Sequence, residues 1–352
     1  MSLHLVTAAD VSSGAAPSDT VIDVRSPAEF AEDHLPGAVN WPVLDDEERR
    51  IVGTLYKQVS PLDARKRGAA MVARNIAAHL EREMADKPRE WRPLVYCWRG
   101  GQRSGSLAWY LGQIGFRTTQ LAGGYKAFRA IVSGDLATLP EWHDFRVVAA
   151  RTGSGKTRLL HALAAAGAQV LDLEALACHR GSVLGGLPGQ PQPAQKRFDT
   201  EVWSALRGFD PARPVFVESE SARIGRLTVP PALLLRMREQ GQIVRVQMED
   251  AARVQLLLAD YGFFADVPED FCRLIGALTE LRGRAKVERW QAMARAGQWA
   301  EVFGELMAQH YDPLYERSLA RSYGSFDGLP VVELGDGGPV ALRAAAQALL
   351  QP

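Results

Sequence analysis

The sequence is poor in cysteine. Only Cys97, Cys178 and Cys272 occur in 352 residues, and no two of them have C-x-x-C spacing. A disulfide framework or a structural zinc site usually has several cysteines at short spacing, so neither is indicated. What remains to be explained is a single thiol, Cys97, in an unusual local sequence.

Net charge and long apolar runs are also lacking. Lysine plus arginine and aspartate plus glutamate each number 41, so a nucleic-acid partner would have to bind a local basic patch. No stretch of about 18 apolar residues predicts a membrane-spanning helix. The N-terminus has no basic head followed by an apolar core, so we expect a cytoplasmic protein.

Strands alternate with helices in the first part of the chain. TVIDVRS, PLVYCW and TTQL have the character of buried strands, whereas PAEFAEDH and RSGSLAWYLGQIG have helical spacing. A long helical region is expected over about residues 45–90, and SGDLATLPEW as a linker. This order predicts an α/β domain over residues 1–138, with a mainly parallel sheet covered on both faces.

A second α/β domain, with a helical C-terminal portion, is predicted over residues 139–352. In FRVVAARTGSGKTRLLHALAAAG an apolar strand runs into a glycine-rich loop and then a helix. AQVLDLEALA, PVFVESES and IVRVQME predict further strands, and the chain is expected to turn helical from about Val267.

The stretch VYCWRGGQRSG places Cys97 at the carboxyl end of a predicted strand, where ligands gather in open α/β sheets. Its neighbours predict an anion cradle that lowers the pKa of the thiol. The cradle residues are Arg99, Gly100, Gly101, Gln102, Arg103 and Ser104. Such a thiolate can attack a sulfur or selenium donor and hold the transferred atom as a persulfide-type anion. The alternative is a buried core cysteine without chemistry.

ARTGSGKT, from Ala150 to Thr157, fits the spacing of a phosphate-binding P-loop, with alanine in place of the first glycine. Ala150 fits the turn if its φ is negative. The predicted phosphate-binding residues are Gly153, Ser154, Gly155, Lys156 and Thr157. The alternative is a glycine turn with an exposed lysine.

Acidic residues follow two predicted strands of the second domain. Glu218 and Glu220 stand where a P-loop protein carries an acid or a metal partner, and Asp172 and Glu174 are weaker candidates. A solvated charge at a strand end is the other interpretation. No metal site is certain from these residues, although Mg²⁺ fits a P-loop.

Three segments together resemble a rhodanese domain over about residues 5–135: the C-x-x-G-x-x-R-S loop, IDVRSPAEFAEDHLPGAVNWP and LAGGYKAF. The resemblance implies that Cys97 carries the chalcogen. Asp23 and Arg25 match the strand-end pair of that family, and we interpret them as a buried structural pair.

The order of rhodanese domain and P-loop, with LEALACHRGSVLGG, VESESARIG and YDPLYERS, is similar to the bacterial tRNA 2-selenouridine synthases. The resemblance runs nearly end to end. It implies conversion of wobble 2-thiouridine in tRNA to 2-selenouridine, with selenophosphate as selenium donor and an S-geranylated intermediate made from geranyl diphosphate. The P-loop would hold the diphosphate or selenophosphate, and Cys97 would present the selenium. A selenophosphate-producing enzyme is an implied partner.

Contacts to the anticodon region of tRNA are expected from basic residues in two segments. His179 and Arg180 can face the anticodon phosphates or the diphosphate, and the alternative is local packing; Cys178 beside them is expected in the core. RLIGALTELRGRAKVERWQAMAR contains six basic and two acidic residues, and Trp290 within it can stack on a base. The candidate contacts there are Arg282, Arg284, Lys286 and Arg289. A merely solvated helix face is the alternative.

Two other functions remain open. One is a nucleotide-dependent tRNA sulfurtransferase, in which Lys156 binds a nucleotide. The other is a non-catalytic module in which a rhodanese domain senses a chalcogen and the P-loop acts as a switch. Intact Cys97 and Lys156 weigh against the second, because modules that only bind often lose the nucleophile.

Overall fold

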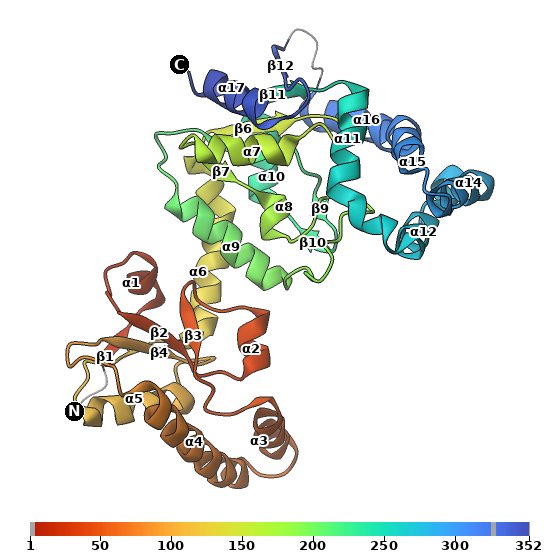
Figure 1. Cartoon of the computed structure of the whole chain (residues 1–352). Coiled ribbons are helices and arrows are strands. Elements are labelled where there is room, and N and C mark those ends of the chain that lie inside the picture. Colours follow the sequence, from red (N-terminus) through yellow and green to blue (C-terminus); the bar gives the residue numbers. More distant parts are fainter. Residues whose placement is uncertain (1–3, 325–328, 352) are drawn as a thin grey trace. The chain divides into compact units, whose positions relative to one another are not determined.

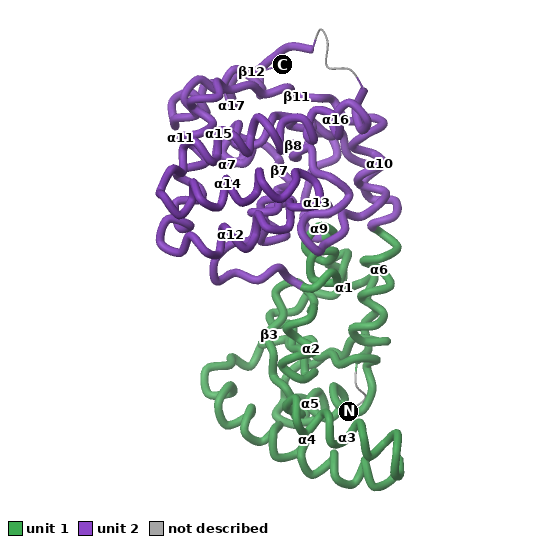
Figure 2. Tube along the Cα trace, turned by 90° about the vertical axis from the view of Figure 1, so that its right-hand side faces the viewer, with its two compact units in different colours: residues 1–135, 194–203 green, residues 136–193, 204–352 purple. Residues whose placement is uncertain are grey.

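The computed structural model describes residues 4–324 and 329–351. Two compact units make up the chain (Figure 2): residues 1–135 with 194–203, and residues 136–193 with 204–352. The assignment of residues 194–203 to the first unit was not expected, and the predicted domain boundary at residues 138 and 139 stays a prediction. Among the described residues no helix has the length and apolarity to cross a bilayer.

The first unit contains a five-stranded parallel sheet in the order β1-β5-β4-β2-β3. Its strands are β1 His4–Val6, β2 Thr20–Asp23, β3 Ala38–Asn40, β4 Pro93–Tyr96 and β5 Thr119–Leu121 (Figure 1). Every residue of β4 is buried, as expected for a central strand of a parallel sheet covered on both faces. The strand therefore delivers Cys97, the next residue, to the carboxyl edge of the sheet.

Helices connect these strands: α1 Ala8–Ser12, α2 Pro27–Glu32, α3 Asp46–Gln58, α4 Pro61–Glu83, α5 Gln102–Ile114 and α6 Gly124–Thr138. Local signals explain their starts, since Ser26 with Glu29 and Asp45 with Glu48 form capping boxes. The helical region expected over residues 45–90 is divided by Ser60, which caps α4. The expected linker at residues 133–142 is wrong, because α6 runs to Thr138 and a 3₁₀ turn, η1, covers Leu139–Trp142.

The second unit has its own parallel sheet, in the order β12-β11-β6-β8-β7. The strands are β6 Phe145–Ala149, β7 Gln169–Leu171, β8 Val215–Glu218, β11 Gln242–Gln247 and β12 Val331–Glu333 (Figure 1). A small antiparallel pair, β9 Arg223–Ile224 and β10 Leu227–Thr228, stands apart from it. The predicted α/β class with parallel sheets is confirmed in both units.

Helices surround this sheet and extend beyond it, as predicted for the C-terminal part. They are α7 Lys156–Ala165, α8 Leu173–Leu176, α10 Pro231–Gln240, α11 Asp250–Tyr261, α12 Pro268–Gly276, α13 Thr279–Arg282, α14 Arg284–Arg295, α15 Trp299–Leu306, α16 Asp312–Tyr323 and α17 Pro339–Leu350. The remaining helix, α9 Gln195–Gly208, begins within the first unit and ends in the second. A 3₁₀ turn, η2 Gly262–Ala265, and a π-helical turn, η3 Met307–Tyr311, complete the set. Phe271, Ile275 and Trp290 are fully buried in the core of this helical region.

Candidate functional site

Cys97 lies between the end of β4 and the start of α5. Its side chain is 4% exposed, and two donors reach the sulfur: the Gly101 amide at 3.3 Å and the Ser104 hydroxyl at 3.2 Å. Gly101 is the N-cap of α5 and is itself exposed. The thiol therefore sits just beneath an exposed loop, at the positive end of a helix.

Two glycines interlock to shape this loop. Gly100 has φ +64°, and a Cβ there would lie 2.5 Å from the Leu121 carbonyl oxygen. Gly124 has φ +57°, and a Cβ there would lie 2.2 Å from the Cys97 carbonyl oxygen. The Tyr125 amide donates to that same oxygen at 2.9 Å. The LAGGY segment thus fixes the cysteine loop by backbone contact, which explains why glycine is required there.

Electrostatics favour the thiolate. Burial acts to raise the pKa of Cys97, but the Ser104 hydroxyl, the backbone amides and the charge of Arg103 outweigh it, so the net pKa is lowered. Arg103 is held by an ion pair of 3.0 Å with Glu29. Of the other predicted cradle residues, Arg99 contributes its amide while its side chain is exposed, and Gln102 is exposed at the start of α5.

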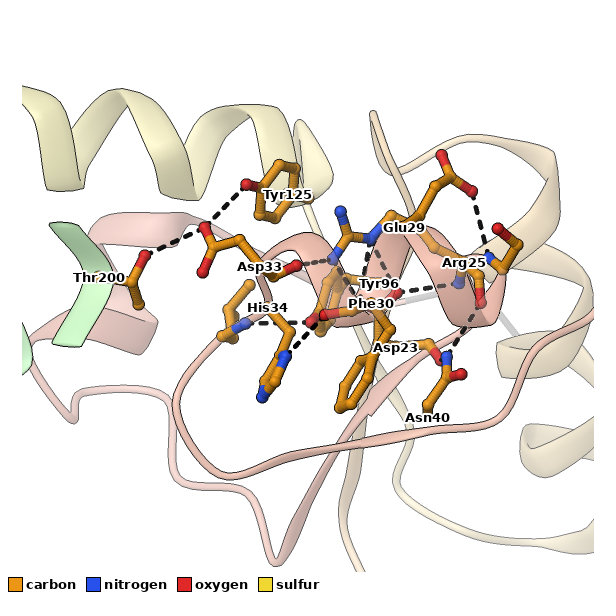
Figure 3. Close-up of polar contacts among 12 residues, drawn as sticks. Asp23, Arg25, Glu29, Phe30, Asp33, His34, Asn40, Tyr96, Tyr125 and Thr200 are labelled. Atoms are coloured by element: carbon orange, nitrogen blue, oxygen red, sulfur yellow. Dashed lines mark hydrogen bonds and ion pairs between the residues drawn. The ribbon is translucent and has the colours of Figure 1, made fainter. Parts of the chain in front are cut away.

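Asp23 and Arg25 form the buried structural pair that the sequence predicts (Figure 3). Both side chains are fully buried, and their ion pair measures 2.6 Å. Arg25 also donates to the backbone oxygen of Asp33 at 2.6 Å, and its guanidinium carbon lies 3.9 Å from the centre of the Tyr125 ring. Asp33 was missed from the sequence, where nothing distinguishes it from an exposed helix-end acid.

The P-loop of the second unit joins β6 to α7. Gly153 and Gly155 both have φ +75°, and Gly155 is the N-cap of α7. Ala150 has no positive φ, since Cys178 is the one non-glycine residue with positive φ in the described chain. Alanine therefore fits the first position of the motif, as expected.

Lys156 and Thr157 point to partners within this site. The Lys156 ammonium donates to the Ala150 carbonyl at 3.3 Å and lies 5.0 Å from the centre of the Tyr315 ring. Burial lowers the pKa of Lys156, but Tyr315 and the nearby carboxylates more than compensate, so the net pKa is raised and the cation is favoured. The Thr157 hydroxyl donates to Glu174 at 3.0 Å.

The two predicted glutamates, Glu218 and Glu220, have different surroundings in the structure. Glu218 is 2% exposed and accepts the Glu174 amide at 2.7 Å; its second oxygen has no partner within the described chain. Burial and the neighbouring carboxylates raise its pKa well above the usual range, which favours the neutral form. Glu220 instead lines a cavity, where burial and Glu174 raise its pKa to about 7. Asp172 caps α8 through the Ala175 amide and also binds His161.

A cavity of about 790 Å³ opens beside the P-loop. The P-loop residues 152–157 line it together with Glu174 and Glu220. Apolar and aromatic residues also line it: Val183, Leu187, Leu257, Leu314, Leu319, Tyr261, Tyr311, Tyr315 and Tyr323. Further polar and charged residues complete the lining, among them Arg158, His161, Asp172, His179, Arg180, Asp260 and His310. One cavity thus combines a phosphate loop with apolar and tyrosine side chains.

Sequence reasoning missed the residues that brace this cavity. Arg253 is fully buried; it donates to the Thr152 carbonyl at 2.6 Å and pairs with Asp312 at 2.6 Å. The Tyr315 hydroxyl accepts the Ala150 amide at 2.9 Å. Asp312 and Tyr315 belong to the YDPLYERS segment, so that resemblance was the one available signal. The preceding π-helical turn, η3, is of a kind often found at functional sites.

Residues 179–183 of the CHRGSVLG segment also line the cavity. Arg180 donates to the Asp260 carbonyl at 2.5 Å, and its guanidinium lies 4.9 Å from the centre of the Tyr261 ring. The His179 Nδ1 accepts the Gly181 amide at 3.1 Å, and burial lowers the pKa of His179. Both residues therefore pack locally and still face the cavity, whereas Cys178, expected in the core, is half-buried.

The basic helical segment does not form one free face. Arg282 donates to His310 Nδ1 at 2.9 Å, and Arg289 pairs with Glu305. The expectation that Trp290 stacks on a base is wrong: it is fully buried and donates to Glu305 at 3.0 Å. Arg284 and Lys286 are exposed and form no ion pair within the described residues.

Comparisons with known proteins match both units. A family model described as the tRNA 2-selenouridine synthase AAA domain matches residues 143–285, and a rhodanese-like domain model matches residues 7–131. The tRNA 2-selenouridine synthase of Marinobacter nauticus is 32% identical over 339 residues, covering 86% of this chain and 89% of the relative.

Two further relatives carry the same description. That of Shewanella denitrificans is 31% identical over 337 residues, covering 86% of this chain and 88% of the relative. That of Nitrosomonas europaea is 38% identical over 245 residues, which are 68% of this chain and 63% of the relative. The match with the Nitrosomonas protein thus spans less than two thirds of its length.

Proposed function

Because the chain belongs to the tRNA 2-selenouridine synthase family, we propose that it replaces sulfur by selenium in the wobble 2-thiouridine of tRNA. Selenophosphate is the selenium donor, and geranyl diphosphate supplies an S-geranyl group to an intermediate. The observation that carries the proposal is the cavity that a phosphate loop lines together with apolar and tyrosine side chains. A prenyl diphosphate likewise combines a charged diphosphate with an apolar hydrocarbon chain.

The geranyl step needs stabilisation of a departing diphosphate. The thiouridine sulfur attacks the allylic C1 of the geranyl group, a C–S bond forms, the C–O bond to the diphosphate breaks, and the uridine loses its N3 proton. Lys156 and the amides that follow Gly153 and Gly155 would bind the negative charge that develops on the leaving group. The apolar and tyrosine side chains would hold the hydrocarbon chain and exclude water from the allylic carbon.

Mg²⁺ fits this site only if a bound diphosphate supplies part of its ligands. Within residues 4–324 and 329–351, no group of three or more histidine, cysteine, aspartate or glutamate side chains is arranged to hold a metal ion. Thr157 and Glu220 could supply one or two ligands, and a bound diphosphate and water would supply the rest, as is usual for Mg²⁺. The ion would add charge neutralisation to that given by Lys156.

The test uses a thiolated anticodon stem-loop and mass spectrometry of the RNA. Geranyl diphosphate alone should give the S-geranyl product, and later addition of selenophosphate should give 2-selenouridine. Cys97→Ser should abolish selenation but leave geranylation, because the thiolate handles only the selenium donor. Lys156→Ala should slow geranyl transfer by about 10²-fold or more. Nucleotide turnover stimulated by tRNA, without a geranyl product, would overturn the proposal.

A further inference from the structure

The selenium step raises a question of electron balance at Cys97. Selenium has the same oxidation state in selenophosphate as in 2-selenouridine, so the overall exchange needs no oxidant. A persulfide-type bond between the Cys97 sulfur and selenium would require the removal of two electrons. Neither the structure nor the proposed reaction supplies an acceptor for them. A redox-neutral reaction of the thiolate with this donor is attack at phosphorus instead.

We propose that Cys97 is a phosphoryl acceptor, an inference that rests on the proposed function. The Cys97 thiolate attacks the phosphorus of selenophosphate, an S–P bond forms, and the P–Se bond breaks as its electron pair leaves with hydrogen selenide anion. Water then attacks the phosphorus of the phosphocysteine, the S–P bond breaks, and orthophosphate leaves with regeneration of the thiolate.

The released selenide completes the exchange on the tRNA. Hydrogen selenide anion adds to C2 of the geranylated 2-thiouridine, geranylthiolate leaves, and the selenium-borne proton passes to N3. Selenophosphate, water and the geranylated nucleoside are consumed, and 2-selenouridine, geranylthiol and orthophosphate are formed. Atoms and electrons balance without a further reagent.

The loop around Cys97 has the donors that a phosphoryl group requires. The Gly101 amide and the Ser104 hydroxyl reach the sulfur at 3.3 and 3.2 Å, and the backbone amides of Ser104 and Arg99 help to lower the pKa of Cys97. Arg103 adds a full positive charge, held in place by Glu29 at 3.0 Å. A single selenium atom would use few of these groups, whereas the three oxygens of a phosphoryl group can accept from all of them.

The leaving group removes the need for a proton donor beside the cysteine. The carboxylate that pairs with Arg103 is Glu29, and although burial acts to raise its pKa, Arg103 and Ser26 lower it overall. Glu29 is therefore ionised and cannot act as an acid. Hydrogen selenide leaves unaided because it is a weak base, but an alkoxide does not. The site should therefore cleave P–Se bonds and leave alkyl phosphates intact.

The test identifies the group that Cys97 carries. The full chain is mixed with selenophosphate, quenched rapidly and digested, and the Cys97 peptide is examined by mass spectrometry. The expected result is a mass increase of one phosphoryl group, with the selenide captured by an alkylating agent and exceeding the released orthophosphate by the amount of adduct. Cys97→Ser, which is close in size, should abolish the adduct and the enzyme-dependent release. Arg103→Gln should slow both by about 10²-fold.

Controls separate this inference from the proposed function. Cys178→Ser should give as much phosphoryl adduct as the unaltered chain. Conversion of the thiolated stem-loop is measured in parallel. Suppose that the chain makes 2-selenouridine. A selenium adduct on Cys97, or release of selenide that does not depend on Cys97, would then overturn the inference and leave the proposed function standing. A chain that forms the phosphoryl adduct but does not modify the RNA supports the inference and overturns the function.

Discussion

Thr200 donates a hydrogen bond of 3.0 Å to the carboxylate of Asp33, although 167 residues separate the two in sequence (Figure 3). The Tyr125 hydroxyl donates to the same oxygen at 2.8 Å, and Arg129 lies 3.6 Å from it. Arg129 also donates to the Thr200 hydroxyl at 2.9 Å. Because Asp33 is fully buried, its carboxylate depends on these partners.

Thr200→Val should destabilise the first unit. The substitution keeps the shape but removes a donor to a buried carboxylate and an acceptor for Arg129, so the free energy of unfolding should fall by about 1–3 kcal/mol. Hydrogen exchange of amides in β2 and β4 measures the loss in this unit alone. Thr54→Val, at an exposed position on α3, is the matched control, with an expected change within about 0.5 kcal/mol. Equal effects of the two would show that the Asp33 network contributes nothing.

Gly124→Ala should disrupt the cysteine loop. The new Cβ would lie 2.2 Å from the Cys97 carbonyl oxygen at a φ of +57°, so we expect a loss of at least about 2 kcal/mol and altered alkylation of Cys97. Thermal unfolding and the rate of iodoacetamide labelling measure the two effects. Gly134→Ala in the same helix, where nothing lies within 4 Å, should instead stabilise by up to about 1 kcal/mol. Normal labelling of Gly124→Ala would contradict the interlock.

Glu220 should make diphosphate binding depend on pH. Burial and the neighbouring Glu174 raise its pKa to about 7. The side chain is therefore neutral below that pH and adds a negative charge to the cavity above it. Affinity for inorganic diphosphate should fall by up to about tenfold, relative to Glu220→Gln, as pH rises from about 6 to about 8.

Calorimetry at each pH compares the affinity of the unaltered chain with that of Glu220→Gln. The titration of diphosphate itself affects both affinities equally and cancels in their ratio. Binding to the unaltered chain should also take up protons near neutral pH, because an added anion favours the neutral Glu220. Glu239→Gln, an exposed carboxylate on α10 outside the cavity lining, is the control. A constant affinity ratio between the unaltered chain and Glu220→Gln would refute the assignment.

Arg284 and Lys286 are the candidates for phosphate contacts in the basic segment. Replacing both with alanine should weaken tRNA binding by about tenfold and reduce the slope of log affinity against log salt by about two. Arg273→Ala with Arg295→Ala is the matched double variant, because Asp270 and Glu269 hold those side chains at 2.8 and 2.6 Å. Filter binding over a range of salt measures the slopes. An equal loss of tRNA affinity in both double variants would mean that the loss reflects total positive charge and not contacts made by Arg284 and Lys286.

The sequence predicted the features that depend on local pattern. A buried apolar strand ending in Cys97, a strand leading into the P-loop glycines, and the pairing of Asp23 with Arg25 all follow from short segments and their order. Glycine spacing and strand-end position are therefore sufficient to predict where the two loops lie in the fold.

Long-range partners could not be predicted. Arg253 donates to the Thr152 carbonyl of the P-loop and pairs with Asp312. These three residues lie far apart in the sequence. The edge strands β1 and β12 are three residues long and mostly exposed, and no strand was predicted at either place. Trp290 was misjudged because its helix also carries arginines, although its spacing from Val287 and Ala294 marks an inward face.

The bond between Asp33 and Thr200 also bears on how the protein is made. The ribosome releases residues 136–193, with the P-loop strand and α7, before Thr200 can reach Asp33. The N-terminal unit therefore cannot be completed in strict order of synthesis, although domains usually fold as they emerge. In a nascent chain arrested before residue 200, the Asp33 carboxylate would lack its Thr200 partner. A chaperone or protease could recognise the incomplete unit.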